Sequence, residues 1–569
     1  MLSRLLLLAL FVTSGASLWG QKQTLSGYIR DASNGETLIG ATVFVEGTTI
    51  GTYTNEYGFY SLSLESGKYT IVASYLGFSD LNAEVDLSVS NQKKDFELQE
   101  EGTQIAEVVV TATEEDKNVK DLQMSVQQLD MATIEKLPTL LGETDVIRSV
   151  LLLPGVTTVG EGAAGFNVRG GSIDQNLVIL DEAPVYNSSH LFGFFSVFNP
   201  DAVKGVKLYK GGIPARYGGR LSSILDVRMR EGNSKNFEAQ GGIGTIFSRL
   251  AIEAPIVKDK GSFLLAGRRS YIDVLAAPFL GDDLGDTKLN FYDLTLKTNY
   301  KLGENDQIFL SGYLGRDVFG FGDQAGFNWG NQTATLRWNH IFNDRLFSNF
   351  TAYYSNYDYE LGFGDDEEDT FDWNARIINY SFKPEFSYFI NPDNVLRFGG
   401  QTIYYEFQPA NAIANNVGEE IDFSLDQQFA LESSIFIENE LNVGARWKFN
   451  YGLRLSHFGY FGGRNVYTYD DEAPLGTERP LMDVTTTDRG ELIEDWINLE
   501  PRASLQYQLN ETSSIKASYM RTAQYIHLLS NTTASVPLDI WTPSTNNIDP
   551  QLADQIAIGY FRNFDDNKY

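Results

Sequence analysis

The chain has 569 residues and a formal net charge of −31. This acidic excess argues against a nucleic-acid-binding protein, because contacts to phosphate groups require Lys and Arg. The chain has no cysteine, which excludes disulfides, cysteine metal sites and an acylated-cysteine lipoprotein anchor.

Residues 1–20 have the pattern of an export signal. Arg4 supplies a positive end, residues 5–12 form a short apolar run, and small residues follow before Gln21. The run is too short to span a bilayer, which needs about 18 apolar residues, and no later segment has such a run. If the exported chain lies in a membrane, it must cross as a closed β-barrel.

Residues 22–99 predict a β-sandwich. Strand-like runs at 24–30, 41–46, 59–64 and 69–75 are separated by Gly and Asn turns. Segments 26–29, 40–43 and 54–60 resemble the carboxypeptidase regulatory-like domain. The resemblance does not imply peptidase activity, because none of the four histidines, at 190, 340, 457 and 527, belongs to a zinc-binding pair.

Residues 104–118 form a linker with a β-branched run between charged flanks. The run consists of Ile105, Ala106, Glu107, Val108, Val109, Val110, Thr111, Ala112 and Thr113. Such a segment can add itself as a strand to the sheet edge of a partner, with backbone hydrogen bonds supplying the affinity. An ordinary strand of the neighbouring domain is the other interpretation, and the residues alone leave both open.

Residues 119–231 predict a mixed α and β domain. A helix is expected over 144–153, ended by Pro154-Gly155, and strands over 176–180 and 205–209. The glycine-rich segments 166–171 and 211–220 lack the lysine pattern of a phosphate-binding loop.

Three segments together resemble the TonB-dependent outer-membrane receptors. The valine-rich run 105–113, Asn-Val-Arg-Gly-Gly at 167–171 and the glycine-rich segment 209–220 are similar in order and spacing to the TonB box and plug of that family. The resemblance implies a plug inside a barrel of about 22 strands. It also implies a periplasmic TonB-type energy-coupling protein that binds residues 105–113.

Residues 235–569 independently predict a large antiparallel transmembrane β-barrel. In the segments 293–302, 447–456 and 503–510, apolar and polar residues alternate over about ten positions, the length a tilted strand needs to cross a bilayer. Short turns, such as those near 303–305, 343–344 and 391–393, alternate with long loops. Outer-membrane barrels show this alternation of turns and loops.

The strand count suggests that this barrel is C-terminally incomplete. Twelve complete strands are expected, and a thirteenth from near Asp554. Because bacterial single-chain barrels have even strand numbers, we expect the natural chain to continue. The predicted fold is therefore mainly β, with an N-terminal β-sandwich, an α+β plug and a partial barrel.

Ion pairs are expected to seat the plug. Arg169, Arg216 and Arg220 lie in plug segments that match the family, and Glu253 and Glu500 lie on expected barrel strands one and eleven. Planar arginine–carboxylate pairs would fix the orientation of the plug. The competing interpretation is that these arginines only solvate plug loops.

The resemblance implies an outer-membrane transporter that imports a scarce nutrient, with its N-terminal domain in the periplasm. The implied partners are the coupling protein, outer-membrane lipid and an extracellular small-molecule, peptide or glycan substrate, with a surface lipoprotein as a further candidate. No enzyme activity, metal, cofactor or nucleic acid is expected. A surface binding, adhesion or sensing protein anchored by the barrel is the alternative, although a passive anchor needs neither a plug nor a partner-binding strand.

Overall fold

A computed structural model describes residues 22–101, 117–137, 139, 142–158, 165–275, 287–321, 325–364, 369–416, 419–470, 472–474, 476–529 and 539–564. The chain forms two compact units. The first consists of Met1–Ala106 with Phe342–Phe347 and Tyr388–Val395, and the second of Glu107–Ile341, Ser348–Ser387 and Leu396–Tyr569.

The N-terminal section consists of two small sheets. One has the order β4-β1-β7, with β8 also paired to β1, and the other has the order β3-β2-β5-β6. The strands are β1 (Lys22–Asp31), β2 (Thr42–Val45), β3 (Gly51–Tyr53), β4 (Phe59–Glu65), β5 (Lys68–Ser74), β6 (Leu81–Asp86), β7 (Gln92–Lys93) and β8 (Phe96–Leu98). Apolar side chains including Ile29, Val43 and Leu62 form a shared buried core. The predicted β fold of this section is confirmed.

The plug is built on a five-stranded sheet of order β13-β12-β17-β16-β9. Its strands are β9 (Val126–Asp130), β12 (Asn176–Leu180), β13 (Ala183–Pro184), β16 (Val203–Tyr209) and β17 (Ser223–Met229), and two short hairpins are β10 (Val156–Thr157) with β11 (Asn167–Val168) and β14 (Ser189–His190) with β15 (Phe195–Ser196). The helical elements are α2 (Lys117–Lys120), α3 (Met131–Ile134), α4 (Val146–Leu151) and η1 (Ile173–Gln175). The helix expected over 144–153 is α4, whose N-cap Asp145 accepts a hydrogen bond from the Arg148 backbone.

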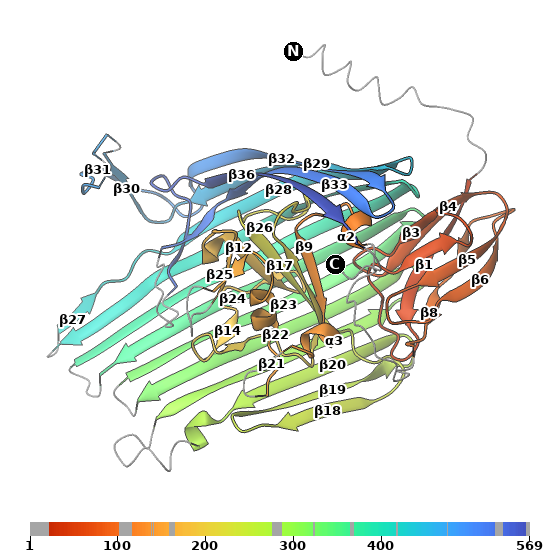
Figure 1. Ribbon diagram of the computed structural model, residues 1–569. Helices are drawn as coiled ribbons and strands as arrows, with labels where there is room; N and C mark the ends of the chain where they lie inside the picture. Colours follow the sequence, from red (N-terminus) through yellow and green to blue (C-terminus); the bar gives the residue numbers. More distant parts are fainter. Residues whose placement is uncertain are drawn as a thin grey trace. The chain divides into compact units, whose positions relative to one another are not determined.

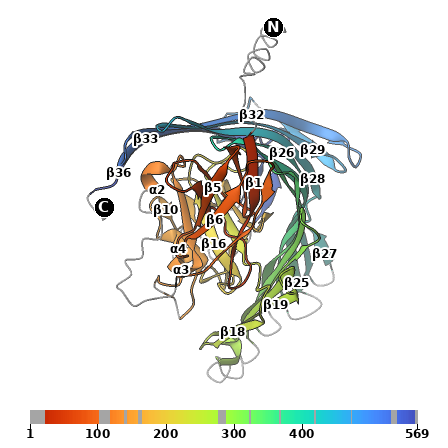
Figure 2. The same ribbon diagram turned by 90° about the vertical axis from the view of Figure 1, so that its right-hand side faces the viewer.

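The second unit also contains one large sheet of fifteen strands (Figure 1). Its path is β18-β19-β20-β21-β22-β23-β24-β25-β26-β28-β29-β32-β33-β36, with β27 paired to β26. The bounds are β18 (Glu238–Ile243), β19 (Phe247–Val257), β20 (Gly261–Ser270), β21 (Lys288–Lys301), β22 (Asp306–Phe321), β23 (Ala325–Asn343), β24 (Leu346–Phe363), β25 (Asp369–Asn391), β26 (Asn394–Asn416), β27 (Glu419–Asp422), β28 (Gln428–Val443), β29 (Trp447–Phe461), β32 (Leu492–Asn510), β33 (Ser513–Gln524) and β36 (Gln551–Arg562). Figure 2 shows this sheet curving around the plug elements.

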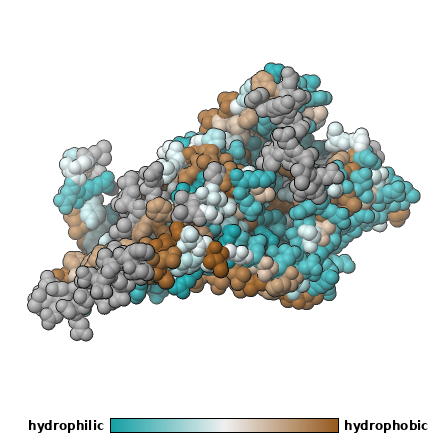
Figure 3. Space-filling model, turned by 60° about the horizontal axis from the view of Figure 1, so that its bottom comes forward, coloured by the Kyte–Doolittle hydropathy of each residue, from teal (hydrophilic) through white to brown (hydrophobic). Residues whose placement is uncertain are grey.

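The two faces of the sheet differ as the sequence predicts. On β21 the polar residues Asp293 and Lys297 are buried, whereas Leu294 is 47% exposed. On β29, Arg454 is buried and Leu453 is exposed. Polar side chains therefore face the plug, and apolar ones face outward, as expected for a wall in contact with lipid. Apolar patches lie beside polar ones on the face shown in Figure 3.

The sequence missed one strand at the start of the sheet. Residues 238–243 form β18, which pairs with β19, so Glu253 lies on the second strand of the path and Glu500, on β32, lies on the twelfth. The expected numbering was wrong because β18 contains two adjacent glycines and does not alternate polar and apolar residues. Three small hairpin strand pairs also lie beyond the prediction: β30 (Asn465–Tyr469) with β31 (Leu481–Thr486), β34 (Ile526–Leu528) with β35 (Trp541–Pro543), and β27 with the end of β26.

Among the described residues, no helix has both the length and the apolar character needed to cross a membrane.

Candidate functional site at the plug and barrel interface

A cavity of about 50 Å³, with both polar and apolar side chains in its lining, lies between the plug and strands β24 to β28. Plug residues on one side and barrel residues on the other line it, including Glu182, Tyr186 and Arg220 from the plug and Asn379 and Lys383 from β25. Two polar contacts cross from wall to plug here: Asn379 donates to the Tyr186 hydroxyl at 2.5 Å, and Lys383 donates to Glu182 at 3.0 Å.

The turn between β12 and β13 carries two acidic residues in an unusual backbone conformation. Leu180 pairs with Ala183, so Asp181 and Glu182 form the two-residue turn. Their φ angles are 47° and 80°, a left-handed region that costs roughly 1–3 kcal/mol for each non-glycine residue. Contacts of the two side chains with the surrounding structure must offset this cost.

Both carboxylates of this turn are buried against cations. Asp181 contacts Lys297 of β21 and accepts a hydrogen bond from the Met229 backbone at 3.0 Å. Burial alone would raise the pKa of Asp181, but Lys297 and Arg337 lower it to about 2. Likewise burial opposes the charge on Glu182, but Lys383 and Arg228 outweigh it and hold the pKa below its usual value.

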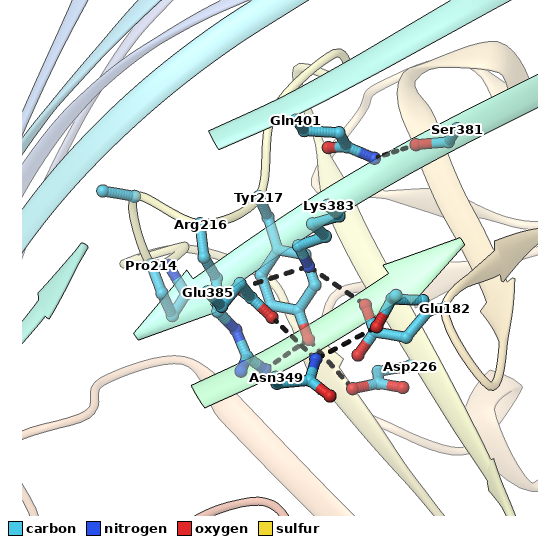
Figure 4. A network of polar contacts seen from close by, with 12 residues as sticks. Glu182, Pro214, Arg216, Tyr217, Asp226, Asn349, Ser381, Lys383, Glu385 and Gln401 are labelled. Carbon is cyan, nitrogen blue, oxygen red and sulfur yellow. Dashed lines mark hydrogen bonds and ion pairs between the residues drawn. The ribbon is translucent and has the colours of Figure 1, made fainter. Parts of the chain in front are cut away.

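Glu182 belongs to a continuous polar network (Figure 4). On the barrel side, Lys383 also contacts Glu385 at 3.4 Å, and Asn349 donates to Glu385 at 3.5 Å. On the plug side, Glu182 lies 3.2 Å from Arg228. Arg228 reaches Asp226, which accepts a hydrogen bond from the Tyr217 hydroxyl, and that hydroxyl accepts one from Arg216. The network links two separate plug segments to β24 and β25.

The plug loop at 213–220 is held mainly through its backbone. Arg502 of β32 donates to the carbonyls of Ile213 and Pro214, and Arg454 of β29 donates to those of Ala215 and Arg216. These two arginines bind carbonyl groups, so the contacts need no polar side chain on the loop.

A close approach explains one of the glycines in this loop. A Cβ atom at Gly218 would lie 2.5 Å from Arg454 Nε, and the next residue, Gly219, has a φ of 78°. The loop also binds the wall through its amide groups, because the Ala215 backbone donates to Glu438 of β28 at 2.6 Å. The Tyr-Gly-Gly sequence is therefore a packing requirement rather than a phosphate-binding feature.

The first described plug segment, α2, is held in the same way. Lys448 of β29 donates to the Lys120 carbonyl at 2.7 Å, and Lys516 of β33 donates to the Asn118 carbonyl at 2.8 Å. Between them, the Val119 carbonyl accepts from Gln506 at 2.6 Å and from Ser514 at 2.8 Å. These donors satisfy carbonyl groups that the end of a helix leaves without intrahelical partners.

A second charged cluster joins the plug to β20, β21 and β22. Arg268 of β20 donates to plug Glu143 at 3.0 Å, to the Ser196 carbonyl at 2.7 Å and to Asp293 of β21 at 2.8 Å. His190 at the end of β14 lies 2.6 Å from Asp317 of β22. Burial raises the pKa of Glu143 against the opposing effect of Arg268 and Arg249.

The five residues expected to form ion pairs all lie at or near the plug and barrel interface. Arg169 donates to Ser125, Arg216 to Tyr217, and Arg220 to the Gly219 carbonyl. Glu253 pairs at 2.7 Å with Arg230, a plug arginine that the sequence did not single out, and Glu500 pairs at 2.9 Å with Arg502 of its own strand. Pairing of the three named arginines with these two glutamates stays a prediction.

The predicted partner-binding run, residues 105–113, lies outside the described residues. Within the described residues, no group of three or more His, Cys, Asp or Glu side chains is arranged to hold a metal ion.

Sequence reasoning missed the acidic turn and His190 as interface residues. The signal for the turn was present, because two acids directly follow the apolar strand 176–180 at a tight reversal. No comparable signal marks His190, whose barrel partner Asp317 is 127 positions away in the sequence.

The chain matches three family descriptions in succession. Residues 25–110 match the CarboxypepD_reg-like domain, residues 118–223 the TonB-dependent Receptor Plug Domain, and residues 273–569 the family described as TonB dependent receptor-like, beta-barrel. The last match covers more than half of the chain.

Known proteins show the same likeness. The chain is 25% identical to the TonB-dependent receptor SusC of Bacteroides thetaiotaomicron over 312 residues, which cover 52% of this chain and 29% of that protein. The fold is similar to that of the copper transporter OprC, with a TM-score of 0.56 at 11% identity, covering 78% of this chain and 71% of that one. It is also similar to the FrpB iron transporter from Neisseria meningitidis (F3-3 variant), with a TM-score of 0.54 at 13% identity, covering 77% and 71%.

Proposed function

Because the chain belongs to the TonB-dependent receptor family, we propose that the protein imports a nutrient across the outer membrane through a plugged β-barrel. The family consists of outer-membrane receptors that act as transporters rather than enzymes. The chain spans less than a third of the length of the curated relative that it matches, so the activity of the whole protein is part of this proposal.

One observation supports transport above all others. Much of the plug is held by the inner face of the sheet through polar contacts, beside smaller apolar clusters such as Leu191 and Phe195 against Phe247 and Phe291. Exchanging such contacts for water costs far less than exposing an apolar interface of similar size, because a typical hydrogen bond contributes only about 0.5–1.5 kcal/mol net. This chemistry suits a plug that must be displaced repeatedly.

The cavity beside Glu182 is our candidate for the section of the interface that a substrate passes. Beside apolar residues such as Leu177 and Ile403, its lining includes tyrosines, amides and charged side chains, which can exchange hydrogen-bond partners with a hydrated solute. We propose that the Glu182–Lys383 pair closes this section while the plug is at rest.

Energy is proposed to enter through residues 105–113, which lie within twelve positions of the start of α2. In this proposal a periplasmic TonB-type protein pairs with the run as an added strand, and the pull reaches the carbonyls of Asn118, Val119 and Lys120. Residues 1–20 as an export signal, 22–99 as a periplasmic domain, 119–231 as the plug and 235–569 as barrel complete the proposed organisation.

The substrate is left open as a small molecule, a peptide or a glycan. OprC and FrpB carry copper and iron in their names, but a likeness at 11–13% identity concerns the fold. Outer-membrane lipid and a surface lipoprotein are further proposed partners.

The coupling proposal is tested by a pair of substitutions at Val109. Val109→Ala keeps every backbone hydrogen bond and should retain most uptake. Val109→Pro removes one N–H donor and restricts the preceding residue, so uptake should be lost while surface expression is normal. Because the substrate is unknown, the measurement is growth of a deletion strain carrying either variant on a panel of limiting nutrients. A well-expressed proline variant that supports the same growth as the unmodified protein would refute the coupling role.

A further inference from the structure

His190 is a buried plug residue that is enclosed by charged groups of the barrel wall. Its Nδ1 lies 2.6 Å from Asp317 Oδ2 of β22, and its Nε2 lies 3.5 Å from Asp293 Oδ2 of β21 and 3.2 Å from the Tyr313 hydroxyl. The ring stacks on Phe291 with centroids 4.4 Å apart and an interplanar angle of 12°. One imidazole thus joins the plug to two neighbouring strands.

The backbone after His190 reinforces this attachment. The Leu191 amide donates to the other oxygen of Asp317 at 2.7 Å. Leu191 and Phe192 have φ angles of 48° and 57°, a conformation that non-glycine residues adopt only when surrounding contacts stabilise it. His190 pairs with Phe195 across the β14–β15 hairpin, so fixing His190 on the wall fixes the hairpin.

The charges around the ring favour its protonated form. Two carboxylates, Asp317 and Asp293, face the imidazole, and Arg268 offsets part of their charge while it also binds plug Glu143. Burial disfavours the imidazolium, but Asp317 and Asp293 outweigh burial, so the pKa of His190 lies above its usual value.

Deprotonation would weaken the attachment without removing every contact. A neutral ring can still donate from Nδ1 to Asp317 and accept at Nε2 from Tyr313. It no longer balances the two carboxylates, and its Nε2 lone pair then faces Asp293. Because the folded-state pKa is raised, the stabilisation is fully present below the unfolded value of about 6.5 and is lost as the pH rises through the folded value.

We propose that protonated His190 is a positioning residue for transport, which holds the β14–β15 hairpin on β21 and β22 while the first plug segment is withdrawn. This inference rests on the proposed function. Loss of the proton weakens the hold on the hairpin, so retention of the plug depends on pH.

The proposal is tested first on the unmodified full chain. The protein is labelled with ¹³C at histidine Cε1 in detergent micelles, and the resonance that is lost in His190→Gln identifies residue 190. We expect the midpoint of its titration to lie above the usual histidine pKa of about 6.5. A titration at or below that value overturns the proposal.

The functional readout is potassium chloride conductance of the full chain in planar bilayers between pH 6 and 9. If the plug is released when His190 loses one proton, the fraction of molecules with a released plug can rise by at most about tenfold per pH unit above the pKa. His190→Gln should conduct equally at both ends of the range, and the control His457→Gln, whose side chain is 41% exposed beside Asp495, should keep the pH step. A pH step in His190→Gln equal to that of the unmodified protein refutes the proposal.

A variant that keeps the histidine guards against a folding defect. Asp317→Asn should lower the titration midpoint of the His190 resonance in inserted protein, and an unchanged midpoint counts against the proposal. None of these measurements involves the substrate or residue 109. Failure at His190 is therefore distinguishable from failure of the import proposal, which the Val109 variants test.

Discussion

On strands β20 to β25 the cationic side chains of the barrel pair with plug carboxylates, beside other donors that bind plug carbonyls such as that of Pro184. On β29 to β33 the cationic side chains instead donate to plug backbone carbonyls. The first wall contains Arg268–Glu143, Lys297–Asp181 and Lys383–Glu182. The second wall contains the four bonds to α2 and those of Arg454 and Arg502 to the 213–216 loop.

The two walls differ in whether the plug side chain, or only the barrel side chain, determines how strongly the plug is held. An ion pair needs both side chains, so a change on the plug or on the wall removes it and leaves a buried charge. A carbonyl is present at every residue, so the second wall holds α2 and the loop without needing a matching polar side chain on the plug. It also holds the segment next to the proposed coupling run, where release is needed.

The largest expected effect is at the acidic turn. Asp181→Asn keeps a residue type that tolerates the left-handed backbone but leaves Lys297 buried without its partner, at a cost of about 3–5 kcal/mol. The free energy of unfolding, from urea titration of tryptophan fluorescence in detergent, should fall accordingly. The control is Asp86→Asn, because Asp86 pairs with Lys68 on an exposed surface, where salt bridges contribute little to stability.

If both substitutions lowered the free energy of unfolding equally, the acidic turn would not be an anchor of the plug.

The stability contributed by Asp181 should also depend on pH. Asp181 has a pKa lowered to about 2, so its stabilising effect is present above the unfolded value of about 3.9 and is lost as the pH falls toward 2.

An intermediate effect is expected when barrel residues that donate hydrogen bonds to α2 are substituted. Gln506→Ala and Ser514→Ala each remove one donor to the Val119 carbonyl, and each lost bond contributes about 1 kcal/mol. Trypsin cleavage after Lys120 requires this segment to leave the wall, so the cleavage rate of the folded protein should rise about fivefold per lost bond. An unchanged rate in the double variant would show that these donors do not retain α2.

The sequence predicted the features that depend on local pattern. Alternation placed Lys297 and Arg454 on polar strand faces, and both are buried toward the plug. Strand 176–180 also has the predicted bounds. These features follow from the two-residue period of a strand, which any correct register must respect.

The contact partners could not be predicted in the same way. Asp181 and Lys297 are 116 positions apart, and no local pattern chooses between Lys297 and other inward-facing cations on the wall. Contacts to backbone carbonyls are even harder to predict from the sequence, because the accepting residue can be of any type. For this reason Val119 and Ala215 did not stand out as interface residues.

The smallest expected effect lies on the plug side of the same α2 contact. Asn118 is exposed, and its carbonyl, not its side chain, accepts the hydrogen bond from Lys516. Asn118→Ala keeps that carbonyl and favours the helix slightly, so the free energy of unfolding should change by less than about 0.5 kcal/mol and the trypsin cleavage rate should stay within twofold, roughly the same free-energy range. Lys516→Ala, which removes the donor, should accelerate cleavage about fivefold. Equal acceleration by both variants would mean that side-chain identity matters on the plug side as well, and the proposed contrast between the two walls would fail.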